Sequence, residues 1–126
     1  MLFRSCRFCN VKTGDPGGWI DPEEPKSIAQ SVKLMNLAYV VLTMVDRDDL
    51  EDGGASHVAT VIREIRRVNP DIVIELLAGD FQGKVESLKI LAGAKPEVFA
   101  HNLETVERLS PRVRDARARY QRSLDV

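Results

Sequence analysis

The feature that most limits the fold of this sequence is an alternation of helical and strand-like hydrophobic patterns. Ile28, Val32 and Met35 recur at helical spacing, and the continuous apolar run 39–43 that follows is typical of a buried strand. The same pair of patterns returns twice. It predicts helices over residues 23–36, 58–68 and 85–92 and strands over residues 39–43, 72–77 and 98–100. Alternating helices and strands favour a parallel sheet with helices packed outside it.

Local signals mark the ends of these elements. Asp21, Pro22 and Glu24 offer an N-cap, a first-turn proline and a capping-box glutamate, so the first helix is expected to begin near Glu23. A further short helix is expected over residues 105–109, ending before Pro111. Because the strand 39–43 is apolar throughout, we expect it to be buried on both faces.

The length of the chain limits it to one domain, residues 1–126, with a modest core. Three strands amount to about half of a (β/α)₈ barrel, whose usual length is about 250 residues. The predicted fold class is therefore α/β, a partial (β/α) barrel truncated at both ends. Residues 1–5 fall where a strand should already be ending, and residues 123–126 stop within an element.

Charge and hydropathy exclude several classes of partner. The 18 Lys and Arg residues nearly balance 19 Asp and Glu, for a net charge of −1, so nucleic acid is not an expected partner. No run approaches the roughly 20 apolar residues of a membrane helix, and residues 1–10 lack the apolar core of a signal peptide. We expect a cytoplasmic protein that does not bind membranes.

Function is expected on the loops that leave the carboxyl ends of the strands. Asp46 and Arg47 follow the first strand most closely, and His101 directly follows the third. The five carboxylates within residues 46–52 are expected mainly to be solvated or to cap a helix, although such a cluster also suits a hard cation. His57 is assigned to structure or surface.

A glycine-rich turn and a tryptophan follow the N-terminal segment. Residues 14–18 lack the lysine and spacing of a phosphate-binding loop, so they predict a tight turn that lines a pocket. Trp19 is expected to stack on a ligand or to pack at the barrel rim.

Cys6 and Cys9 are the only cysteines, and a reducing compartment would keep them as thiols. Three chemistries are open to this C-x-x-C pair. A redox pair would normally begin a helix, but a glycine-rich loop follows here. A zinc site would need both histidines to converge on the pair. An iron–sulfur cluster is compatible if another ligand is supplied.

The residues around this pair resemble a known family. Residues 3–11, FRSCRFCNV, are similar to the end of the cluster-binding loop of lipoyl synthases, radical S-adenosylmethionine (SAM) enzymes in which it reads roughly C-T-R-x-C-x-F-C-x-V. The likeness continues, in order, through residues 17–18, 21–25, 41–50, 52–54, 80–83, 98–106 and 119–124. It covers essentially the whole chain.

The resemblance implies a partial (β/α) barrel of the radical SAM type, in which three cysteines hold a 4Fe-4S cluster and SAM binds its open iron. Reductive cleavage of SAM would give a 5′-deoxyadenosyl radical that abstracts hydrogens from carbons 6 and 8 of a protein-bound octanoyl chain. A second, auxiliary 4Fe-4S cluster supplies the sulfur. The implied partners are an octanoylated carrier protein or lipoyl domain and an electron donor such as ferredoxin or flavodoxin.

By position in the motifs, the resemblance makes Cys6 and Cys9 the second and third cluster ligands and Phe8 the aromatic residue that meets the adenine. It places Thr43 and Asp46 where the methionyl amino group is usually held. Asn102 and Glu104 are the predicted ribose or methionyl contacts, followed by His101 and Arg47.

The sequence departs from the family at the first cluster cysteine, because Leu2 stands there and Phe3 replaces the following threonine. The cysteine triplet of the auxiliary cluster and the serine-bearing segment that completes it are absent. We therefore expect an internal fragment that cannot make lipoyl groups alone. Two alternatives are a remnant domain that binds SAM or a carrier protein without catalysis, and a barrel lyase that uses a divalent metal ion at the 46–52 carboxylates.

Overall fold

Three parallel strands form the sheet of this chain, as the computed structural model of residues 3–126 shows. The strands are β1 (Tyr39–Thr43), β2 (Val73–Leu77) and β3 (Val98–Ala100), in the order β1-β2-β3. Val41 pairs with Glu75, and Leu77 pairs with Ala100. The predicted parallel α/β arrangement is confirmed, with the strands at nearly the predicted positions.

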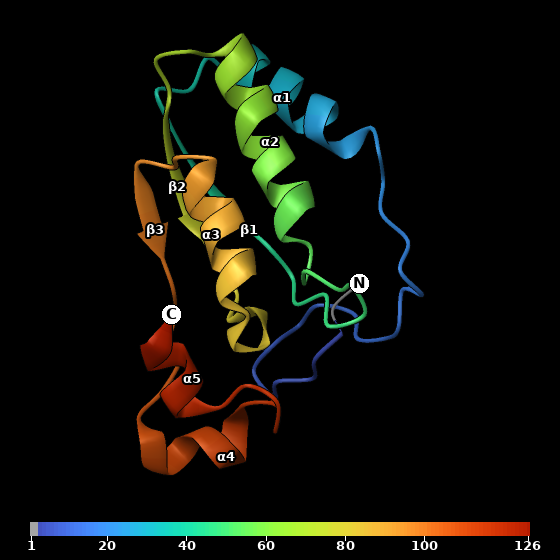
Figure 1. Ribbon diagram of the computed structural model, residues 1–126, viewed down its shortest axis with the longest axis vertical. Helices are drawn as coiled ribbons and strands as arrows, with labels where there is room; N and C mark the ends of the chain where they lie inside the picture. The colour runs from blue at the N-terminus through green and yellow to red at the C-terminus, as the bar shows by residue number, and fades with distance from the viewer. Residues whose placement is uncertain (1–2) are drawn as a thin grey trace.

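Three helices cover one face of this sheet (Figure 1). They are α1 (Glu24–Leu34), α2 (Ala55–Val68) and α3 (Val85–Gly93), and α2 contacts both of the others. The apolar stripe of α2 packs against the inward residues of β2, so Ile62, Ile65, Ile74 and Leu76 are all fully buried. The core of the molecule lies between this helical layer and the sheet.

The prediction that the first strand is buried on both faces is wrong. β1 lies at the edge of the sheet, and only its alternate residues face the helices. Tyr39 and Val41 point to the other face and are 46% and 49% exposed. The Tyr39 hydroxyl donates a hydrogen bond to Glu75 across that face. The sheet is therefore open on the side away from the helices.

The N-cap position of the first helix is Glu23 and not the predicted Asp21. Asp21 accepts a hydrogen bond from the Glu23 amide, forming a turn before the helix instead of capping it. Pro25 occupies the first turn, where its missing N–H leaves no helical bond unmade. Met35 lies just past the last turn and is 66% exposed, so it does not extend the core stripe.

Short helical segments complete the chain after β2 and β3. They are η1 (Phe81–Gly83), η2 (Glu107–Leu109), α4 (Ser110–Val113) and α5 (Tyr120–Asp125). The short helix predicted before Pro111 corresponds to η2, which ends at Leu109, but α4 follows directly and Pro111 lies in its first turn. Of the helices in residues 3–126, none is long and apolar enough to cross a membrane.

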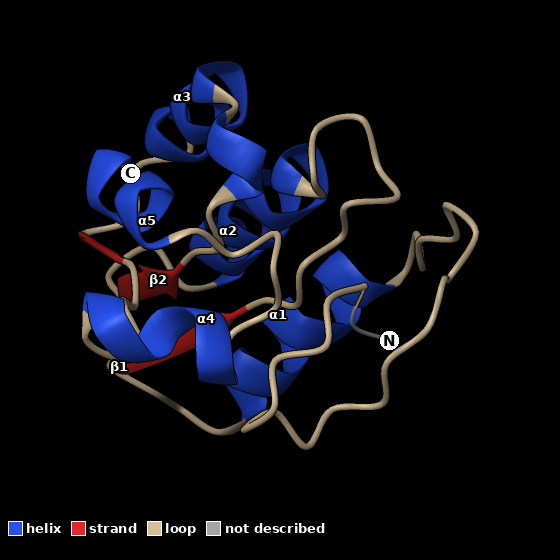
Figure 2. Cartoon of the chain, turned by 90° about the horizontal axis from the view of Figure 1, so that it is seen from below, coloured by secondary structure: helices blue, strands red, loops and turns tan. Residues whose placement is uncertain are grey.

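The N-terminal segment, α4 and α5 gather at the carboxyl ends of the strands, at the lower end of Figure 1. Figure 2 views the molecule from that end, with the loops of the N-terminal segment beside α1 and with α4 and α5 near the strands. The edge of the sheet where ligands usually bind in α/β folds is thus surrounded by segments distant in sequence.

Candidate functional site

A pocket of about 190 Å³ lies at the carboxyl edge of the sheet. Its walls come from the N-terminal segment, the ends of β1 and β2, the residues after β3 and the segment between α4 and α5. It is lined by eight of the nine residues that the sequence resemblance selected, all but Arg47: Cys6, Phe8, Cys9, Thr43, Asp46, His101, Asn102 and Glu104. Tertiary structure therefore brings these residues together, and the role of each stays a prediction.

The two cysteines lie in a turn of the N-terminal segment. The Cys9 amide donates a hydrogen bond to the Cys6 carbonyl at 3.0 Å, and both thiols are free and half-buried. The Asp115 amide donates to the Cys6 sulfur at 3.2 Å. Burial raises the pKa of the Cys6 thiol, although the hydrogen bond from Asp115 and the nearby charge of Arg114 oppose this shift.

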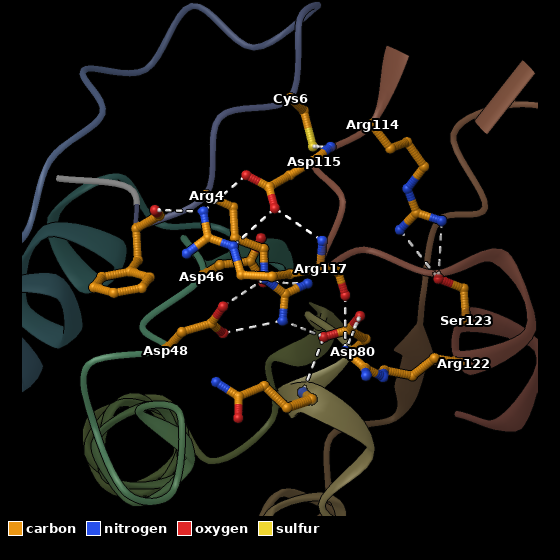
Figure 3. A network of polar contacts seen from close by, with 12 residues as sticks. Arg4, Cys6, Asp46, Asp48, Asp80, Arg114, Asp115, Arg117, Arg122 and Ser123 are labelled. Atoms are coloured by element: carbon orange, nitrogen blue, oxygen red, sulfur yellow. Dashed lines mark hydrogen bonds and ion pairs between the residues drawn. The ribbon is translucent and has the colours of Figure 1, made fainter. Parts of the chain in front are cut away.

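Arg4 anchors the cysteine turn to the strand ends from one side (Figure 3). Its guanidinium is almost fully buried and bonds Asp48 through two nitrogens, at 2.8 and 3.0 Å. A third bond, of 2.6 Å, joins it to Asp80 after β2. Burial opposes ionisation of both carboxyl groups, but their hydrogen bonds with Arg4 outweigh it, so both pKa values are lowered.

The segment between α4 and α5 anchors the turn from the other side. The Asp115 carboxylate accepts hydrogen bonds from the Ser5 amide at 2.9 Å and from the Ser5 hydroxyl at 3.2 Å. The Arg7 amide donates to the Val113 carbonyl at 2.8 Å. Arg117 pairs with Asp115 at 2.8 Å, which holds the pKa of that carboxyl far below its usual range. The cysteine turn is thus fixed on two sides by protein contacts alone.

Asp46 has a more distant cationic partner than Asp48 and Asp80 have. Its nearest one, the Arg4 guanidinium, is 3.7 Å away and is already bonded to Asp48 and Asp80. Burial, assisted by the charges of Asp80 and Asp48, raises the pKa of Asp46 despite Arg4. Asp46 is therefore available to a cationic ligand group.

The residues after β3 complete the pocket. Ring nitrogen Nδ1 of His101 lies 2.8 Å from the Ala78 carbonyl, and because a carbonyl only accepts, Nδ1 carries the proton. The Nε2 atom of His101 is buried and has no hydrogen-bond partner within residues 3–126. Glu104 adopts a left-handed backbone with φ of 66°, which marks a sharp turn of the chain beside the pocket.

The carboxylates of residues 46–52 have separate roles. Asp52 accepts bonds from the amides of Gly54 and Ser56 at the start of α2, which confirms the predicted capping role. Asp48 and Asp49 are not solvated, because each is paired with an arginine. Since these charges are already neutralised, the run does not form the cation site that a metal-dependent lyase needs.

Arg47 and Trp19 lie away from the cysteine pocket. Arg47 pairs with Asp49 at 2.7 Å and donates to the Trp19 carbonyl at 2.8 Å. The Trp19 side chain is 68% exposed, so the prediction that it packs at a rim is wrong. Asp15 and Pro16 of the glycine-rich turn do line a surface pocket, as predicted, together with Trp19.

A larger cavity of about 350 Å³ lies between α1, α2 and the end of β1. Its walls are mainly apolar, and it holds the His57–Glu24 pair, whose atoms are 2.6 Å apart, together with Arg47. Volume alone does not identify the ligand site, because other surface pockets reach about 560 and 800 Å³. The smaller pocket is lined by the two thiols, Asp46 and the residues after β3. Because it holds these reactive and charged groups, it is the candidate functional site.

Sequence reasoning missed three charged residues of the site: Arg4, whose contacts are described above, Asp80 and Arg114. Asp80 lies in the loop after β2, and its only signal was that position. Arg114 lines the pocket at 9% exposure, but it lies between two short helices that hydrophobic periodicity did not reveal. All three act through contacts with residues more than 30 positions away or with the pocket itself, which local patterns do not encode.

The thiols do not make a complete cluster site. The resemblance requires three thiolates, and the first is expected at Leu2, which lies outside the described residues. Within residues 3–126, no three His, Cys, Asp or Glu side chains are grouped so that they could hold a metal ion. The donor set of the described residues therefore does not fit a cluster held by three cysteines.

Comparisons with known proteins point to one family. Lipoyl synthase of Pyrobaculum arsenaticum is 54% identical over 123 residues, and that of Halorhodospira halophila is 56% identical. A mitochondrial lipoyl synthase of Aedes aegypti is 54% identical. Each alignment covers 98% of this chain, but the chain spans only 42%, 37% and 31% of these relatives, respectively. The family model described as “Radical SAM superfamily” matches residues 3–126. The chain therefore belongs to the radical SAM superfamily.

Proposed function

We propose that this chain forms the SAM-binding part of a lipoyl synthase, the enzyme that inserts sulfur at carbons 6 and 8 of a protein-bound octanoyl group. The observation that carries the proposal is the single pocket in which Cys6, Cys9 and Phe8 meet Thr43, Asp46, Asn102 and Glu104. Identity of 54–56% to proteins named lipoyl synthase supports it. The three-stranded sheet would then belong to a (β/α) barrel.

The chemistry of the pocket suits SAM, which combines an adenosine, a sulfonium and an amino acid. Asp46 would hold the methionyl amino group, because its own ion pair, with Arg4, is long at 3.7 Å. Phe8 is 55% exposed and offers an aromatic surface beside the adenine. Asn102 and Glu104 would contact the ribose or methionyl groups. Since 190 Å³ is below the usual size of ligand sites, the ligand would extend over the open sheet face.

The octanoyl group would be presented by a carrier protein or lipoyl domain, and ferredoxin or flavodoxin would supply electrons. The free thiols Cys6 and Cys9 suit a reducing compartment such as the cytoplasm. Because Leu2 replaces the first cluster cysteine, we expect the chain as given to bind SAM without producing lipoyl groups. A domain that binds SAM without cleaving it is the second candidate function, and the same replacement favours it.

Anaerobic reconstitution with iron and sulfide tests the proposal. We expect the chain to gain no stable cluster absorbance, whereas the Leu2→Cys variant gains about four irons and forms 5′-deoxyadenosine from SAM under reducing conditions. Leu2→Ser is the matched control, since it adds a polar group without a thiol. Failure of Leu2→Cys to hold iron would contradict the proposed cluster ligands. Octanoyl thiolation by the unchanged chain would contradict the expected inactivity.

A further inference from the structure

Positive charge is concentrated in the segment 108–122. This segment contains six arginines and one acidic residue, Asp115, whereas the whole chain has a net charge of −1. It includes α4 and the start of α5, which lie near the carboxyl ends of the strands (Figure 2). The positive charge is therefore placed at the edge of the sheet that holds the pocket.

Three of these arginines serve the fold. Arg117 pairs with Asp115, and Arg122 lies 3.8 Å from Asp80. Arg114 is buried in the wall of the pocket. Because these three guanidinium groups are directed into the protein, they are not available to a partner.

The other three, Arg108, Arg112 and Arg119, have exposed side chains. Arg7 adds a fourth exposed arginine, and its amide donates a hydrogen bond of 2.8 Å to the Val113 carbonyl, which holds it against α4. None of these four forms an ion pair within residues 3–126. We call these four residues the arginine rim.

The arginine rim borders the candidate site. Arg7 lies between Cys6 and Phe8 in the sequence, and both of these neighbours line the pocket. Arg119 directly follows Ala118, which lines the pocket from the opposite end of the chain. A partner that contacts the rim would therefore be held at the entrance to the pocket.

Exposed guanidinium groups without ion pairs suit an acidic protein surface. A guanidinium binds carboxylates through paired, charge-assisted hydrogen bonds, and arginine is enriched in protein interfaces. Nucleic acid would require a more extensive positive field than four exposed arginines provide on a chain of net charge −1. The charge pattern therefore favours a protein partner.

We propose that the arginine rim docks an acidic face of the protein that carries the octanoyl group. The inference rests on the proposed function, which makes the substrate protein-bound. It adds a surface that recognises the protein part of the substrate, separate from the pocket that binds SAM. Because these contacts are exposed, they set the orientation and the rate of association more than they add to affinity.

The test measures the dissociation constant of a fluorescein-labelled, octanoylated lipoyl domain for this chain by fluorescence anisotropy. The triple variant Arg108→Glu, Arg112→Glu, Arg119→Glu should weaken binding about 10- to 100-fold, because three attractions become repulsions. Replacing the same residues by lysine keeps the charge and should change the dissociation constant by less than about threefold. Raising the salt from about 50 to about 200 mM should weaken binding to the unchanged chain, because exposed charges are screened.

The matched control makes the same change of charge away from the pocket, in the triple variant Lys33→Glu, Arg63→Glu, Lys95→Glu. These residues lie in α1, in α2 and just after α3, and their side chains are exposed. None of them lines the pocket. Circular dichroism checks that each variant folds, and the control should bind the lipoyl domain within about threefold of the unchanged chain.

Equal weakening in the two glutamate variants, or no binding of the lipoyl domain to the unchanged chain, would overturn the inference. Tighter binding to a short DNA duplex than to the lipoyl domain would overturn it in favour of a nucleic-acid partner. SAM binding by the unchanged chain is measured in parallel. Loss of rim-dependent docking with SAM binding intact would contradict this inference alone, whereas absence of SAM binding would contradict the proposed function.

Discussion

The guanidinium of Arg4 and the carboxylate of Asp80 are 2.6 Å apart, although the two residues are separated by 76 positions. Their contact joins the N-terminal segment to the loop after β2, and both side chains are almost fully buried. Asp48 adds a second carboxylate from the loop after β1. This network holds the cysteine turn at the sheet edge, and its contacts have measurable consequences.

Replacing Arg4 by methionine should lower the free energy of unfolding by about 3–5 kcal/mol, because it leaves the buried Asp80 charge with only the more distant Arg122, at 3.8 Å. Urea unfolding measures this loss. Arg7→Met is the matched control, since Arg7 lies in the same segment with an exposed side chain and should change stability by less than about 0.5 kcal/mol. Equal stability of the two variants would contradict the proposed role of Arg4.

Acid should unfold the chain through the same network. The folded pKa values of Asp48 and Asp80 lie below the unfolded value of 3.8, so their contribution is present above that pH and is lost as pH falls through the folded values. Asp46 has a raised pKa and acts in the opposite sense, because its ionisation lowers the free energy of unfolding as pH rises. Unfolding free energies measured from neutral pH to about pH 2 should therefore fall steeply, and Arg4→Met should flatten the curve.

Asp46→Asn should separate stability from ligand binding. Burial disfavours the ionised carboxyl, so its removal should raise the free energy of unfolding at neutral pH or leave it unchanged. The same variant should bind SAM more weakly, because the proposed partner of the methionyl amino group loses its charge. Thermal unfolding and ligand titration measure the two effects. A variant that is less stable and binds normally would count against this account of Asp46.

Asp115→Ala should loosen the cysteine turn, because Ser5 loses both bonds to the carboxylate. Burial raises the pKa of the Cys6 thiol and lowers its thiolate fraction, so exposure should speed its alkylation several-fold. Mass spectrometry after timed iodoacetamide treatment reports the rate for Cys6. Asp71→Ala, an exposed residue before β2, should leave that rate unchanged. Equal rates in both variants would mean that Asp115 does not restrain the turn.

Two glycines allow a steric effect to be separated from a backbone effect. Gly17 and Gly53 share a φ of 64°, but a Cβ at Gly53 would lie 2.9 Å from the Phe81 ring, whereas Gly17 has open space. Gly17→Ala should therefore cost about 1–2 kcal/mol for the left-handed backbone alone. Gly53→Ala should cost clearly more, because the loop after β1 must move away from Phe81. Equal costs in urea unfolding would show that Phe81 yields easily.

Local patterns predicted the strands better than the ends of the helices. The bounds of β1 and β3 match the prediction, since short apolar runs between polar loops carry a strong signal. α5 was not predicted, because six residues rich in polar side chains show no helical stripe. η2 ends before Pro111 as predicted, but α4 was missed because proline both follows helices and begins them.

The sequence by itself determined the alternation of helices and strands, the cysteine pair and the positions of most polar residues that line the pocket. These features depend on neighbouring residues or on a contiguous motif. Only the tertiary structure decided that Arg4 joins Asp48 and Asp80, and that Arg114 is buried in the pocket without an acid. Such pairings depend on which strand ends meet in space, and a linear pattern does not contain that information.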